Sequence, residues 1–209
     1  MEDPTVERIT GLGFMILSLL REGDMHPYEM MRLMRQRHDD RFVAISNGTF
    51  YHTVGRLERL GLVDEVGVER AGNRPERTTY ALTDAGRETV VDWVRRELPG
   101  IDRPAEFRVA LAEAHHLRRD EVVALLRTRR AALAELHGMQ VEARREAREK
   151  DVPRQFILEV EREDAMLAAE LTWLEGIITA LEEHAFPWGV DELDGPTERY
   201  LADREEARR

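Results

Sequence analysis

The sequence contains no cysteine among its 209 residues. This excludes disulfides, thiol redox sensing and zinc sites with thiolate ligands. It also lacks any stretch near the roughly 20 apolar residues that a membrane-spanning helix needs. The longest apolar patch, residues 12–20, is interrupted by Gly13 and Ser18. The chain begins with an acidic segment, unlike a secretory signal peptide. We therefore expect a cytoplasmic protein that does not enter a membrane.

The sequence also has fewer positively charged than negatively charged residues. The formal net charge is −11, which taken alone argues against a nucleic-acid partner. The part up to Leu98 carries a net charge of only −3, and the remainder carries −8. Acidic residues are thus concentrated in the second half. Nucleic-acid binding by the first half would depend on where its individual arginines lie.

The first half shows the pattern of a winged helix-turn-helix. Thr10 is a good N-cap for a first helix, and Pro27 suits the first turn of a second one. Ser46 begins a third helix that ends before Gly61. Residues 62–69 and 77–82 alternate like a β-hairpin with a loop at 70–76, and Thr83 begins a fourth helix. This order of elements predicts three helices, a two-stranded wing and a further helix.

The third helix has two contrasting sides. Phe50, Val54 and Leu57 recur at helical spacing and predict a buried stripe. The opposite side carries Gly48, His52, Gly55, Arg56 and Arg59. A glycine inside a helix costs about 1 kcal/mol relative to alanine. Gly55 on the outward side therefore indicates that another molecule approaches the backbone there.

These features predict that the third helix and the wing bind DNA. His52, Arg56 and Arg59 can reach base edges in the major groove, where arginine matches guanine best. Thr49 and Tyr51 flank that side and can donate to phosphates. The wing carries Arg70, Arg74 and Arg77, which suit an adjacent minor groove. The alternative is that these arginines are ordinary solvated charges, since Glu58, Glu69 and Glu76 lie among them.

Three short sequence motifs resemble those of a known protein family and follow one another in the expected order. They are His26-Pro-Tyr-Glu29, then Asn47-Gly-Thr-Phe-Tyr51 with Arg56-Leu-Glu-Arg-Leu-Gly-Leu62, then Asn73-Arg-Pro-Glu-Arg77 with Tyr80-Ala-Leu-Thr-Asp-Ala-Gly86. Together they resemble the PadR family of transcriptional regulators, which are mostly repressors, some released by phenolic or drug-like aromatic compounds. The sequence departs from the family at His52, where proline is usual, and this leaves the base preference open.

The resemblance implies DNA contacts at Tyr28, Gly48, Thr49, Tyr51 and Arg74. With the residues expected from the helix pattern, the whole predicted DNA-binding set is Tyr28, Arg32, Asn47, Gly48, Thr49, Tyr51, His52, Arg56, Arg59, Arg70, Arg74 and Arg77.

The second half is predicted to be helical. Residues 99–104 contain two prolines and a glycine and predict a boundary between a DNA-binding domain, 1–98, and a helical domain, 99–189. Residues 190–209 form a polar tail that is expected to fray or be disordered. The last long helix has a near-heptad seam typical of a coiled coil. This seam is the predicted dimerisation surface: Ile157, Val160, Leu167, Leu171, Leu174, Ile178 and Leu181. The long final helix is similar to the dimerisation domain of longer PadR members.

A small-molecule site is predicted between the two domains. The expected effector-binding residues are Trp93, Met166, Trp173 and Ile177, although packing in a core is the commoner use of tryptophan. We predict no metal site. Glu113, His115 and His116 are close in sequence, but adjacent side chains on a helix point about 100° apart. No nucleophile–base pairing or phosphate-binding loop appears, so we predict that the protein is not an enzyme.

The sequence thus predicts a mainly α fold with a small β-hairpin wing, followed by a helical dimerisation domain. The expected function is that of a homodimeric, sequence-specific regulator that binds a pseudo-palindromic operator in double-stranded DNA. We expect a repressor released by a small aromatic effector, with no cofactor. The alternative is a winged-helix module that binds a protein or a ligand without DNA, and a helical enzyme is a second rival.

Overall fold

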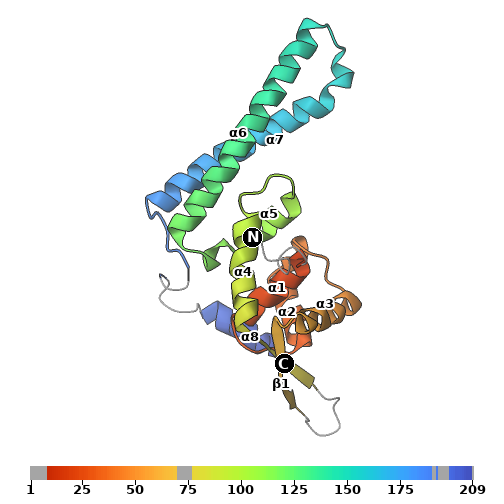
Figure 1. The fold of residues 1–209 in the computed structure, drawn as a ribbon, viewed down its shortest axis with the longest axis vertical. Helices are drawn as coiled ribbons and strands as arrows, with labels where there is room; N and C mark the ends of the chain where they lie inside the picture. Colours follow the sequence, from red (N-terminus) through yellow and green to blue (C-terminus); the bar gives the residue numbers. More distant parts are fainter. Residues whose placement is uncertain (1–8, 70–76, 190–191, 193–197, 209) are drawn as a thin grey trace.

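The computed structural model describes residues 9–69, 77–189, 192 and 198–208. These form a compact head and a long helical hairpin that projects from it (Figure 1). The head contains α1 (Gly11–Leu20), α2 (Pro27–Gln36), α3 (Asn47–Arg59), β1 (Val63–Glu69), β2 (Arg77–Leu82), α4 (Asp84–Glu97) and α5 (Pro104–Ala112). The projecting hairpin, called the arm below, consists of α6 (Arg119–Glu149) and α7 (Leu158–Glu182). A last helix, α8 (Glu198–Arg208), returns to the head.

Helix α1 is the centre of the head. Its residues from Leu12 to Leu20 are all buried, so it has no face left for solvent. Thr10 caps it by accepting a hydrogen bond from the amide of Gly13 at 3.2 Å. Helices α3, α4 and α5 and strand β2 pack around it. Trp93 of α4 stacks on Phe14 with ring centroids 4.1 Å apart, which anchors α4 against α1.

The helix-turn-helix and the wing form as the sequence predicts. Ser46 and Thr83 cap α3 and α4 with their hydroxyl oxygens. The strands β1 and β2 pair antiparallel from Val63 opposite Leu82, with an irregularity between Glu65 and Gly67. Outside this hairpin, the backbones of Met25 and Tyr80 exchange two hydrogen bonds of 3.1 Å, which joins the start of α2 to the wing. The mainly α fold with a hairpin wing is confirmed.

The boundary expected near residue 99 falls within a packed region. Helix α5 follows it, yet packs on α1 and α4 of the head. Phe107, Val109 and Ala110 of α5 are buried in the core. The compact unit therefore extends through α5, and the arm begins with α6. The sequence signal at residues 99–104 marks a turn in the chain and not the end of the packed unit.

In the arm, the heptad seam of α7 packs against α6 of the same chain. Of the seven residues predicted to form the dimer contact, Leu167, Leu174, Ile178 and Leu181 are buried, and the rest are partly buried. Helix α7 packs along α6, and the five seam residues from Leu167 to Leu181 belong to the hydrophobic core or pack against it. The assignment of this seam to a second chain is therefore corrected. A heptad pattern specifies that a helix has a partner, but not whether the partner belongs to the same chain.

Arg129 of α6 joins the arm to the head. Its side chain is 2% exposed, and two of its nitrogens bind Oε1 of Glu170 on α7 at 2.7 and 2.8 Å. Nη1 donates to the carbonyl of Gly100 in the connecting segment. The guanidinium lies 3.5 Å from the centroid of the Phe107 ring on α5. Removing the charge of Glu170 would leave the buried Arg129 without its acidic partner, which is destabilising.

The tail is not frayed where the structure describes it. Residues 198–208 form α8, which packs on α2. Arg204 donates to the carbonyl of Glu22 at 2.6 Å, and Arg208 pairs with Glu29 at 3.1 Å. Ala207 is buried. This helix is hard to predict from the sequence because it has hardly any apolar stripe. No helix among the described residues is long and apolar enough to cross a bilayer.

Gly86 provides a test of how closely α4 packs on the wing. A Cβ at this position would overlap the carbonyl oxygen of Leu62 and lie 2.6 Å from Cδ1 of Leu82. We expect Gly86→Ala to lower the free energy of unfolding by about 1–3 kcal/mol through overpacking. Urea denaturation measures the change. Gly55→Ala is the matched control, because a Cβ there meets nothing within 4 Å. Equal stability of the two variants would contradict this packing.

Candidate nucleic-acid interface

The outward side of α3 presents the predicted recognition residues. Phe50, Val54 and Leu57 turn inward and are buried, as the pattern predicts. Asn47, Gly48, Thr49, Tyr51, His52 and Arg59 are exposed, and Gly55 and Arg56 are half-buried. The Nε of Arg59 donates to the carbonyl of Gly55 at 3.0 Å, so Arg59 lies along the helix surface. The structure thus brings these α3 residues together on one continuous surface.

The beginnings of α2 and α3 place further polar groups beside this surface. His26 caps α2 through Nδ1, which accepts from the amide of Tyr28 at 3.0 Å. Tyr28 is 48% exposed, and the guanidinium of Arg32 lies 5.9 Å from its ring. Ser46 accepts from the amide of Thr49 and donates to the hydroxyl of Thr49 at 2.9 Å. A helix N-terminus offers amide donors and a positive dipole end, which favours a phosphate.

Of the three wing arginines in the predicted set, one lies within the part of the chain that the structure describes. Arg70 and Arg74 lie outside the described residues, and Arg77 begins β2. Their DNA contacts therefore stay predictions. The strand Val63–Glu69 does carry an exposed Val66 toward the tip of the wing.

The predicted effector residues do not enclose a site together. Trp93 is wholly buried in the head, where it stacks on Phe14 and its indole donates to the carbonyl of Ile9 at 3.3 Å. Met166 and Trp173 lie on the outer side of α7 and are 56% and 43% exposed. Ile177 is partly buried against the core. Trp93 thus has the packing role that is common for tryptophan, and the other three lie along the arm.

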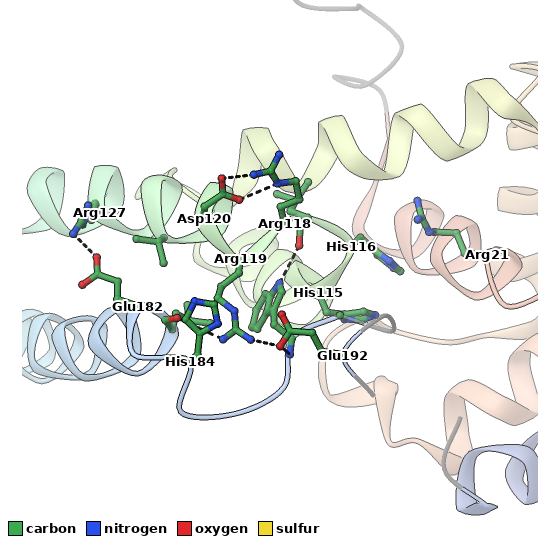
Figure 2. A pocket seen from close by; sticks show the side chains of 15 residues that line it. Arg21, His115, His116, Arg118, Arg119, Asp120, Arg127, Glu182, His184 and Glu192 are labelled. Atoms are coloured by element: carbon green, nitrogen blue, oxygen red, sulfur yellow. Dashed lines mark hydrogen bonds and ion pairs between the residues drawn. The ribbon is translucent and has the colours of Figure 1, made fainter. Parts of the chain in front are cut away.

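A cavity that the sequence did not predict lies where the head meets the arm (Figure 2). Its volume is about 840 Å³. Three of its arginines form ion pairs with acids that also line it: Arg118 with Asp120, Arg119 with Glu192 and Arg127 with Glu182. Trp188 closes one wall, with its indole nitrogen donating to the carbonyl of Leu117 at 2.9 Å. These residues are dispersed in the sequence, so only packing brings them together.

Arg21, the C-cap residue of α1, also lines this cavity and differs from the other arginines there. Among the described residues, no acid forms an ion pair with it, although Glu113 attracts it at longer range. Burial and the nearby charge of Arg87 lower the pKa of Arg21. The charge of Arg21 favours a negatively charged group on a ligand that enters this part of the cavity.

Glu113, His115 and His116 meet at the same end of the cavity. Oε2 of Glu113 lies 3.0 Å from Nε2 of His116, and the hydroxyl of Ser18 lies 2.8 Å from the same nitrogen. Although burial opposes it, hydrogen bonds from His116 and Ser18 hold the pKa of Glu113 below its ordinary value. Burial and the neighbouring His116 lower the pKa of His115. Our expectation that the two histidines point apart is wrong, because residues 114–116 form a 3₁₀ turn and not an α-helix.

The sequence of the head matches a known family. Residues 16–92 match the model of the transcriptional regulator PadR-like family. This part of the chain is therefore similar to PadR-like proteins, and the members of that family are regulators of transcription. The match begins within α1 and ends within α4, and it includes α2, α3, β1 and β2. No curated protein matches the chain.

Three solved structures resemble the chain over most of its length. PadR of Bacillus subtilis in complex with operator DNA is 20% identical, covering 83% of this chain and 98% of that chain, with a TM-score of 0.41. The protein smu.1604c of Streptococcus mutans UA159 is 21% identical, covering 80% and 98%, with a TM-score of 0.38. Bacillus subtilis PadR in complex with p-coumaric acid is 19% identical, covering 83% and 99%, with a TM-score of 0.37.

Gly55 tests whether another molecule approaches α3 closely. Nothing within 4 Å would meet a Cβ there, so the protein's own packing does not require glycine. Gly55→Ala should keep or raise stability by up to about 1 kcal/mol, because alanine favours a helix. If DNA contacts this backbone, the same variant should weaken DNA binding, measured by fluorescence anisotropy. Unchanged DNA affinity in Gly55→Ala would show that DNA does not approach here.

Proposed function

We propose that the protein is a homodimeric, sequence-specific DNA-binding regulator of transcription that acts as a repressor. The observation that carries this is the exposed surface of α3 in a PadR-like domain, where His52, Arg56 and Arg59 lie opposite the buried stripe. This is where a helix-turn-helix protein presents its recognition residues. A cytoplasmic location follows from the same proposal, since the DNA would be reached there.

The contacts fall into two kinds. Arg56 and His52 in the middle of α3 are placed to read base edges in the major groove. Tyr28, Arg32, Asn47, Thr49 and Tyr51 lie around the starts of α2 and α3 and would fix the protein on phosphates. The head has no net positive charge, so affinity would come from these local groups. The wing arginines Arg70, Arg74 and Arg77 would add contacts in a neighbouring groove.

Arg56→Ala tests base reading. An operator is first selected from a random library of double-stranded DNA with the full chain. The variant should lose about 1–3 kcal/mol of affinity for this operator and far less for random DNA, because a bidentate arginine discriminates between bases. Fluorescence anisotropy at several salt concentrations measures both.

Arg87→Ala is the matched control, since Arg87 is an exposed arginine on α4. It should leave the operator affinity unchanged. An equal loss in both variants would indicate nonspecific charge attraction. A weak, salt-insensitive response of the unmodified protein would instead favour the winged-helix module that binds a protein or ligand without DNA.

The dimer surface that we propose is a second stripe on α7. Its members are small or apolar and recur at spacings of three and four: Met166, Ala169, Trp173 and Gly176. They are exposed, whereas the first seam is used on α6. Large apolar side chains in such a repeat indicate a helical partner, and the small residues between them let a second helix come close. A second copy of α7 would supply the same repeat in a two-fold arrangement.

Trp173→Glu tests this surface. A charge at the centre of the stripe should convert the dimer to a monomer, which sedimentation velocity measures over a range of concentrations. Thr179→Glu is the control, because Thr179 is exposed on another side of α7. It should remain a dimer. A dimer that survives Trp173→Glu, or a wild type that is monomeric, would remove this surface from the proposal.

We propose that a small effector binds in the cavity between the head and the arm. The residues that the sequence pointed to do not surround a cavity, whereas this one is lined from α1, from the turn before α6 and from the end of α7. A small aromatic acid would place its charge near Arg21 and its ring against Trp188. It can weaken DNA binding only as far as it prefers the conformation that does not bind DNA.

A further inference from the structure

The cluster of Glu113, His115 and His116 has the composition and spacing of a metal site. One ligand atom from each of the three lies within 4.8 Å of the other two. The ring centroids of the two histidines are 4.3 Å apart. Figure 2 shows both rings at the end of the cavity that lies toward Arg21. Neither DNA contact nor dimer formation, as proposed above, uses these residues.

The chain conformation explains why neighbouring histidines converge. Helix α5 ends at Ala112, and Ala114–His116 form a 3₁₀ turn before the extended Leu117. The side chains therefore do not follow α-helical spacing. Glu113 and His116 are three residues apart, which places them on the same side of such a turn. His115 lies beside them, and one of its ring nitrogens already lies within 4.8 Å of the ligand atoms of both.

We propose that Glu113, His115 and His116 bind a divalent transition metal ion, with Zn²⁺ as the preferred metal. Imidazole nitrogens and a carboxylate oxygen are ligands that zinc accepts, at about 2.0–2.2 Å. Ligand atoms around a tetrahedral ion of this size lie about 3.3 Å apart. The contact of 3.0 Å between Glu113 and His116 is close to this spacing. The ligand atom of His115, within 4.8 Å of the other two, would move closer to them when the ion binds.

Ser18 contacts two of the proposed ligands and would hold them in place without binding the ion itself. Its hydroxyl lies 2.5 Å from Oε2 of Glu113 and 2.8 Å from Nε2 of His116. When His116 binds the ion through Nε2, its proton is carried on Nδ1, and the Ser18 hydroxyl remains a donor to the carboxylate. Groups that hold ligands in this way commonly change metal affinity by about 10–100-fold when removed. Because Ser18 belongs to α1, the ion would connect the central helix of the head to the turn that precedes the arm.

The arrangement does not fit a hydrolytic triad. In such a triad the serine and the acid bind different nitrogens of the histidine. Here Ser18 and Glu113 both contact Nε2 of His116. Two histidines that line the cavity, with Glu113 behind them, would instead leave a fourth position for water or a ligand, as in three-ligand zinc sites.

The test uses the full chain without a histidine tag, freed of metal by a chelator. Zn²⁺ is titrated by calorimetry, and Co²⁺ by visible absorption, which reports coordination by nitrogen and oxygen. We expect one ion per chain and a melting temperature that rises with Zn²⁺. His115→Gln should weaken Zn²⁺ binding at least about tenfold. The loss of a group that only supports a ligand already weakens metal binding by about 10–100-fold. His115 is exposed, so this variant should fold.

His184→Asn is the matched control, because His184 lines the same cavity but is not part of the cluster. It should bind Zn²⁺ like the wild type. Ser18→Ala should bind more weakly than wild type and keep the stoichiometry. The proposal is overturned if no saturable binding of one ion per chain is found, or if His115→Gln binds as tightly as wild type. Equal losses in His115→Gln and His184→Asn would also overturn it. These outcomes do not depend on whether the protein binds DNA.

Discussion

The complete burial of α1 constrains the rest of the head. A helix that is apolar around its whole circumference must be covered on every side. Helices α3, α4 and α5 and strand β2 provide that cover. Since α3 gives its apolar stripe to α1 and its surroundings, its polar side can only face outward. The surface proposed to bind DNA is thus a consequence of how the core is closed.

The junction between the head and the arm depends more on polar groups than the core of the head does. Arg129 contacts Glu170, the carbonyl of Gly100 and the ring of Phe107, and so holds α7, the connecting segment and α5 at one point. The cavity with Arg21 and the cluster of Glu113, His115 and His116 lie between the same two parts. A change of ligand or charge there would act on the orientation of the arm. If the arm carries the dimer contact, it would also act on the spacing of the two heads.

The two apolar stripes of α7 show how far a sequence pattern reaches. The seam from Ile157 to Leu181 could be recognised from its spacing, and we expected it to contact a second chain. The more regular stripe, from Ile157 to Leu181, packs on α6, and the stripe with Met166 and Trp173 is left exposed. Hydrophobic spacing gives the face of a helix but contains no information on which partner covers it. The turn after α6 reverses the direction of the chain, so α7 packs on α6 of the same chain.

Local interactions were predictable from the sequence by itself, because they join residues a few positions apart. The caps at Thr10, Ser46 and Thr83, the proline at the start of α2 and the order of helices and wing all form as expected. Tertiary structure decided what depends on distant partners. It placed α5 in the head and α8 on α2, buried Trp93 against Phe14, and brought Ser18 to His116 across 98 residues. Such contacts are set by the closing of a shared core, which no short stretch of sequence encodes.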